Sequence, residues 1–131
     1  MMVVLDTNVI VSALWTPNGK LSYILSRVIA GSLNICHDYR ILAEYRDVLF
    51  RPKFKSRTWQ VNALLETFDE DGISIVAIPL PKIPFKDESA RKFYEVARFC
   101  GAPLVTGNVK NYPKDEIVMT VAEYYEQLIS D

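Results

Sequence analysis

Short apolar runs alternate along the chain with longer segments in which apolar residues recur every three to four positions. The runs occupy residues 2–5, 33–36, 73–78, 104–105 and 117–119. Continuous apolar runs of this length are typical of strands that are buried in a parallel sheet. In the segments between the runs, apolar residues recur every three to four positions, which is typical of helices that pack one face against such a sheet.

The helical spacing predicts where the helices lie. They are expected over residues 9–14, 21–29, 59–68 and 87–99, with two more after the capping residues Asp38 and Thr120. Strands that alternate with helices predict right-handed crossovers and a sheet covered on both faces. We therefore expect an α/β fold, a three-layer α/β/α sandwich around a mainly parallel sheet of four to five strands. A length of 131 residues suits one domain spanning residues 1–131.

Composition narrows the class of protein. Apolar residues make up 50% of the chain, charged residues make up 24%, and the formal net charge is −1. This balance argues against a strongly basic nucleic-acid binder, although it is compatible with a local basic patch. The sequence contains neither a basic leader nor an apolar stretch of ~20 residues, and its two cysteines show no metal-binding or disulfide pattern. We expect a cytoplasmic protein without a membrane span.

Three acidic residues that are far apart in sequence fall where a predicted strand and a predicted helix meet: Asp6, Glu44 and Asp87. Asn108 follows the fourth strand. Ligands of parallel sheets bind beyond the carboxyl ends of the strands, so these four side chains could converge there. Carboxylate groups bind hard divalent cations such as Mg²⁺ and Mn²⁺, which suggests phosphodiester hydrolysis. The structural alternatives are a helix cap at Asp6 and a stabilised first helical turn at Asp87.

Four segments resemble the motifs of PIN-domain nucleases, in the same order along the chain. They are Leu5-Asp6-Thr7-Asn8 and residues 41–45, 87–97 and 104–108. The resemblance covers nearly the whole chain and is closest to the VapC-like toxins of prokaryotic toxin–antitoxin systems. It implies an endoribonuclease that uses Mg²⁺ or Mn²⁺, with metal ligands at Asp6, Glu44 and Asp87 and a further catalytic residue at Asn108. It also implies an RNA substrate, a cognate antitoxin and a homodimer.

One position departs from this pattern. The resemblance predicts an aspartate seven residues before Ala97, and the chain has Ala90 there. Asp87 lies about one helical turn earlier and could partly compensate. The resemblance therefore implies weak or absent cleavage, and a PIN fold that binds RNA or an antitoxin without cutting is the alternative. A phosphatase with Asp6 as nucleophile is disfavoured, because Asn8 stands where a second acid is needed.

A basic loop is a candidate for RNA contacts. Its four cations are Arg51, Lys53, Lys55 and Arg57, with Phe54 among them and Trp59 just beyond. Cations bind phosphates and aromatic faces stack on unpaired bases. Arg91 and Lys92, close to the predicted site, are further candidates for phosphate contacts. The alternative is a solvated loop whose aromatic residues pack in the core or contact a partner.

Overall fold

The computed structural model describes residues 1–16, 19–53 and 58–130. Within these residues the strands are β1 (Met2–Leu5), β2 (Asn34–His37), β3 (Ile73–Ser74), β4 (Leu104–Val105) and β5 (Val118–Met119). The α-helices are α1 (Thr7–Trp15), α2 (Lys20–Ile29), α3 (Tyr39–Leu49), α4 (Thr58–Asp71), α5 (Arg91–Cys100) and α6 (Val121–Ser130). Two short 3₁₀ helices, η2 (Glu88–Ala90) and η3 (Val109–Asn111), lie before α5 and after β4.

The strands form one parallel sheet in the order β3-β2-β1-β4-β5. The central strand β1 aligns Val3 with Ile35 of β2 on one side and Leu5 with Val105 of β4 on the other. Parallel neighbours need crossover connections, which place helices over both faces of the sheet. Val3, Val4 and Leu5 are accordingly inaccessible to solvent. The predicted α/β class with a mainly parallel sheet is confirmed.

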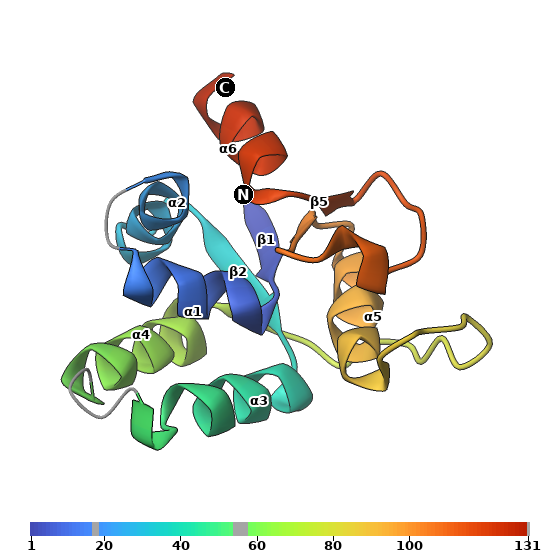
Figure 1. Ribbon diagram of the computed structural model, residues 1–131, viewed down its shortest axis with the longest axis horizontal. Coiled ribbons are helices and arrows are strands. Elements are labelled where there is room, and N and C mark those ends of the chain that lie inside the picture. Colours follow the sequence, from blue (N-terminus) through green and yellow to red (C-terminus); the bar gives the residue numbers. More distant parts are fainter. Residues whose placement is uncertain (17–18, 54–57, 131) are drawn as a thin grey trace.

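Helices cover the sheet on two sides, as a three-layer sandwich requires. Figure 1 shows α1, α2 and α4 on one side of the strands and α5 on the other. Helix α3 contacts α1, α4 and α5, and in this view it lies beneath the ends at which β1 and β2 finish. Helix α6 packs against α2 near the start of the chain. The carboxyl ends of the central strands therefore face α3 and the first turns of α1 and α5.

The helix ends follow the capping chemistry that the sequence predicts. Asp38 Oδ1 accepts a hydrogen bond from the backbone nitrogen of Ile41 at 3.0 Å, which caps α3. Thr120 and Glu123 exchange two bonds, of 2.9 and 3.1 Å, at the start of α6. Helix α5 ends at Gly101 in the left-handed conformation, at φ +65°. Local side-chain chemistry therefore sets the direction in which α3 and α6 leave the sheet.

Two predicted elements differ from the structure. The third strand was expected over residues 73–78, but β3 ends at Ser74, and the side chains of Val76 and Ile78 are 84% and 67% exposed. The Ile75 nitrogen still donates to His37 O at 3.0 Å, and the exposed side chains beyond it show that the chain leaves the edge of the sheet there. The helix expected over residues 87–99 begins instead as η2 and continues as α5, because Asp87 caps η2 through the backbone nitrogen of Ser89.

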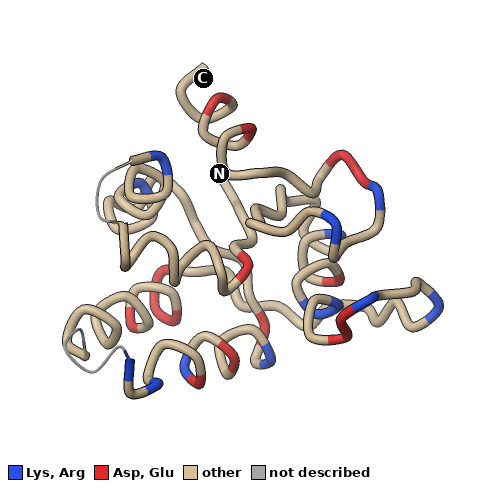
Figure 2. Tube along the Cα trace, in the orientation of Figure 1, with Lys and Arg blue, Asp and Glu red and all other residues tan. Residues whose placement is uncertain are grey.

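Charged residues are distributed over most of the molecule. Figure 2 shows basic and acidic positions interspersed on the helices and loops of the described chain. Cys36 and Cys100 are both free thiols, as expected. Within the described ranges, no helix combines the length and the apolar character needed to cross a membrane.

Candidate functional site

Asp6 lies at the carboxyl end of β1, where the neighbouring strand β4 also ends. Its backbone nitrogen donates to Val105 O at 3.0 Å, which extends the β1–β4 pairing by one residue. Its carboxylate oxygen Oδ2 accepts from Thr106 Oγ1 at 2.9 Å and from the Tyr112 hydroxyl at 2.8 Å. Two hydroxyl donors from the chain after β4 thus hold one oxygen of Asp6.

The electrostatic environment of Asp6 is that of a partly buried acid beside a second acid. Burial is the largest influence and raises the pKa of the Asp6 carboxyl above its ordinary value of 3.8. The bonds from Tyr112 and Thr106 act in the opposite direction, and the negative charge of Glu44 raises the pKa again. The structure therefore brings Asp6 and Glu44 within electrostatic range of each other.

Glu44 reaches this region from the middle of α3. Oε2 accepts a hydrogen bond from the hydroxyl of Thr7, the first residue of α1. Oε1 forms an ion pair with Lys92 Nζ at 2.6 Å, and the side chains of Lys92 and Glu44 are only 13% and 24% exposed. Both carboxylate oxygens of Glu44 are therefore occupied by donors from this chain.

The third predicted acid does not join this pair. Asp87 is exposed, and its Oδ1 accepts from the backbone nitrogen and the hydroxyl of Ser89, at 3.0 and 2.7 Å. These bonds to Ser89 lower the pKa of Asp87. Ala90, where the motif has an aspartate, is 96% buried. The compensation expected from Asp87 is thus absent in this geometry, because the carboxylate caps η2.

Asn108 lies at the same end of the sheet but contacts it through its backbone. The Asn108 nitrogen donates to Thr106 Oγ1 at 3.0 Å, while its side chain is exposed. The nearby Gly107 nitrogen donates to Asn8 Oδ1 at 3.1 Å, which ties the β4 motif to the first motif. The structure therefore places Asn108 beside Asp6 through Thr106, and its predicted catalytic role stays a prediction.

The predicted RNA-contacting cations have different surroundings. Arg51 and Lys53 are exposed, and Arg51 forms a loose ion pair with Asp47 at 3.3 Å. Lys55 and Arg57 lie outside the described residues.

Arg91 is engaged at all three guanidinium nitrogens. It bonds twice to Glu88, at 2.7 Å each, and once to Leu80 O at 2.5 Å, and it lies over the Phe85 ring at 4.7 Å. Arg91 therefore holds the loop before η2 onto α5, which leaves it poorly suited to bind phosphate.

Tyr112 and the Lys92–Glu44 pair were not predicted from the sequence. Tyr112 lies beyond η3, outside the four motifs, and no local pattern marks it as a partner of Asp6. Lys92 stands inside the third motif and was considered only as a phosphate contact. A basic residue two positions after the missing acid was the available signal for it.

The residues present do not match the requirements of a divalent metal ion. Across residues 1–16, 19–53 and 58–130, no three aspartate, glutamate, histidine or cysteine side chains lie close enough to hold one ion. Mg²⁺ and Mn²⁺ favour several oxygen ligands and a compensating negative charge. Here Glu44 pairs with the Lys92 ammonium group, Asp6 accepts from two hydroxyl groups, and the third ligand position carries the methyl group of Ala90.

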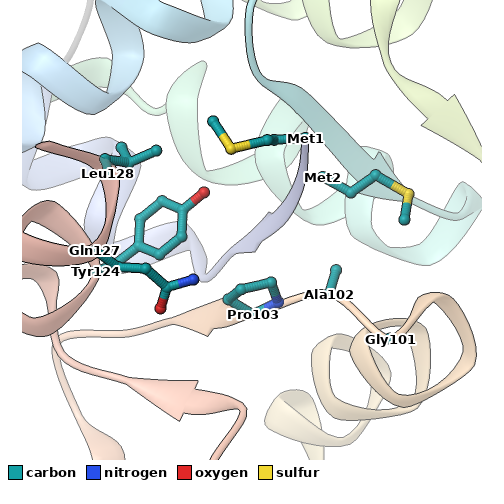
Figure 3. Close-up of a pocket in the computed structure, with 8 residues that line it drawn as sticks. All are labelled: Met1, Met2, Gly101, Ala102, Pro103, Tyr124, Gln127 and Leu128. Atoms are coloured by element: carbon teal, nitrogen blue, oxygen red, sulfur yellow. The ribbon is translucent and has the colours of Figure 1, made fainter. Parts of the chain in front are cut away.

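A separate pocket lies at the amino ends of β1 and β4, opposite the ends that carry Asp6 and Thr106 (Figure 3). Its lining residues are Met1, Met2, Gly101, Ala102, Pro103, Tyr124, Gln127 and Leu128. Met2 begins β1 and Pro103 precedes β4, whereas Asp6 and Thr106 follow the far ends of these strands. Since its lining side chains carry no charge, the pocket is no alternative to the Asp6–Glu44 site.

Comparison with known proteins adds one finding. A family model described as "PIN domain" matches residues 2–110, which include Asp6, Glu44, Asp87, Ala90 and Asn108. The comparisons with curated proteins and with solved structures gave no match.

Proposed function

Because this chain belongs to the PIN-domain family, we propose that it is a PIN-type endoribonuclease whose own metal site is incomplete. PIN nucleases generally use divalent metal ions. The scaffold reaction is the hydrolysis of RNA phosphodiesters with Mg²⁺ or Mn²⁺, and the chain as it stands performs it weakly or not at all.

The observation that carries the proposal is the approach of Asp6 and Glu44 at the carboxyl ends of the parallel strands. These two acids are 38 positions apart in the chain and lie within electrostatic range of each other there, and Thr106 and Tyr112 fix the orientation of Asp6. A partly buried acid next to a second acid is unfavourable for folding, so such pairs are more typical of functional sites than of structural ones. The absence of a carboxylate at Ala90 supports the part of the proposal in which the site is impaired.

The biological setting is part of the same proposal. The motifs resemble those of VapC-like toxins, which supports a toxin that a cognate antitoxin protein restrains, and a homodimeric assembly. RNA is the proposed substrate, and Arg51 and Lys53 are exposed cations suited to its phosphates. Arg51 lies two residues beyond the end of α3, the helix that carries Glu44.

A second candidate function is binding without cleavage. It is favoured by the ion pair between Lys92 and Glu44, which occupies a carboxylate that the reaction needs. A PIN fold of this kind would bind RNA or an antitoxin and leave the RNA intact.

The test compares cleavage of a mixed pool of structured RNA, in Mn²⁺, by four proteins. They are the wild-type chain, Ala90→Asp, the neutral control Ala90→Asn, and Ala90→Asp combined with Glu44→Gln. The last protein controls for contaminating nuclease, and circular dichroism checks that each variant folds.

Cleavage by Ala90→Asp alone, lost again with Glu44→Gln, supports a nuclease that lacks one carboxylate. Equal cleavage by the wild-type chain and Ala90→Asp would show that Asp6 and Glu44 suffice. If none of the four proteins cuts while all of them fold, the binding function becomes the better account. Retention of labelled RNA by the wild-type chain would then be the direct measurement of that function.

A further inference from the structure

Lys92 is held in place from three directions beside the acid pair. Its ammonium group pairs with Glu44 Oε1 at 2.6 Å and donates to Ser89 O at 2.5 Å. It also lies 5.1 Å from the centre of the Phe93 ring. Since 87% of the side chain is shielded from solvent, water screens the attraction to Glu44 less than it would at an exposed pair. Lys92 is therefore a fixed part of the site.

The charge balance of the site shows what the ammonium group does. Asp6 and Glu44 contribute −1 each and Lys92 contributes +1, so the three groups sum to −1. A third carboxylate at position 90 would bring the sum to −2, the charge that one divalent ion neutralises. Lys92 thus provides in this chain part of the compensation that a metal ion provides in a complete site.

We propose that Lys92 takes the place of the divalent ion in this chain, so that an internal cation balances the charge of Glu44 beside Asp6 and the folded protein gains little from Mg²⁺ or Mn²⁺. A metal ion that approached Glu44 would meet the ammonium charge at close range and would find two carboxylates where it needs more. The inference concerns the charge balance of the site and does not depend on whether the chain cleaves RNA.

The experiment measures how Mn²⁺ changes thermal stability and how much heat its binding releases, in a charge series. Wild type has a site charge of −1. Lys92→Met and Ala90→Asp both have −2 by different routes, and their combination has −3. Methionine keeps most of the aliphatic length of lysine against Phe93. Lys86→Met, which removes an exposed lysine before η2, is the matched control.

The melting temperature of wild type and of Lys86→Met should be nearly unchanged by Mn²⁺, with no binding heat. Lys92→Met should melt at a lower temperature without metal and recover when Mn²⁺ is added. An ion present at ten times its dissociation constant raises the equilibrium constant for folding about elevenfold. For a domain of this size, that change raises the melting temperature by about 5 °C. A Lys92→Met protein that folds only with Mn²⁺ gives the same support.

Measurable Mn²⁺ binding by wild type, with a melting shift as large as that of Lys92→Met, would overturn the proposal. The proposal would also be overturned if Mn²⁺ raised the melting temperature of the Ala90→Asp proteins but not that of Lys92→Met, because the missing carboxylate alone would then limit metal binding. That second result would leave the proposed nuclease function intact. Conversely, a metal response in Lys92→Met together with no RNA cleavage by any variant would support Lys92 as the internal cation and count against the nuclease.

Discussion

Tyr112 donates its hydroxyl hydrogen to Asp6 Oδ2 over 2.8 Å, and Tyr112→Phe removes this donor alone. The ring should stay in place because it packs edge-on against Phe85, with centroids 6.3 Å apart and an interplanar angle of 86°. A hydrogen bond to a charged group contributes about 1.5–3 kcal/mol. Because Asp6 keeps the Thr106 hydroxyl as a second donor, we expect the free energy of unfolding to fall by about 2 kcal/mol, near the lower end of this range.

The loss should depend on pH. The folded-state pKa of Asp6 is raised, chiefly by burial, while the Tyr112 hydroxyl lowers it. Because this pKa is raised, protonated Asp6 contributes to the free energy of unfolding. The contribution is fully present at pH values below the ordinary pKa of 3.8, and it is lost as the pH rises through the folded-state pKa. Removing the Tyr112 donor raises the pKa further. The variant should therefore lose most stability where Asp6 is ionised and least in acid.

Urea denaturation followed by circular dichroism, at a pH of about 7 and again in mild acid, measures both effects. Tyr94→Phe is the matched control, because the Tyr94 hydroxyl donates to Asp115 at 2.7 Å. Asp115 retains a backbone bond from Ile117 and an ion pair with Arg98 at 3.4 Å, so this control should lose only about 0.5–1 kcal/mol. The reasoning would be refuted if Tyr112→Phe matched wild type near neutral pH, or if its loss were the same at both pH values.

Two further substitutions, each with a control, test the close packing at Gly72 and the charge pairing at Arg40. Gly72→Ala would place a methyl group 2.2 Å from Phe68 O and 2.8 Å from Ile35 O, both backbone atoms, so unfolding in urea should show a loss of about 3 kcal/mol. Gly107→Ala, whose nearest atom is Asn8 Oδ1 at 3.4 Å, should lose much less. Arg40→Met would leave Asp38 and Glu95, both 97% buried at the side chain, without the cation that pairs with each at 2.7 Å. We expect a loss of about 3 kcal/mol near neutral pH, against less than about 0.5 kcal/mol for the exposed Arg51→Met. A small loss for Arg40→Met would show that water reaches these acids.

The order of strands and helices was predictable from the sequence because it depends on local periodicity. The apolar run before Asp6 is long enough for one buried strand, and Asp38 carries its capping chemistry in its own side chain. The third strand was predicted too long, since the run that ends at Ile78 has strand character whether or not a neighbour pairs with it. Pairing is a property of the sheet edge, and β3 has a partner on one side only.

The sequence predicted some features of the candidate site, and other features depended on the tertiary structure. The positions of Asp6, Glu44 and Asn108 could be proposed from motifs, since each motif is a short stretch of sequence, and so could the missing acid at Ala90. The partners of these residues could not: Tyr112 reaches Asp6 across 106 positions of the chain, and Lys92 meets Glu44 from a different helix. Which acid faces the site also depended on where α5 begins, and the cap at Asp87 turned that carboxylate toward Ser89.

By itself, then, the sequence determined the α/β layering, the helix caps and the stretches of chain that carry acidic residues, because hydrophobic spacing and side-chain capping act over a few residues. Only the tertiary structure decided which charges meet. The packing of α3 and α5 at the carboxyl ends of the strands brings Lys92 to Glu44, where the motifs alone would predict a metal ion.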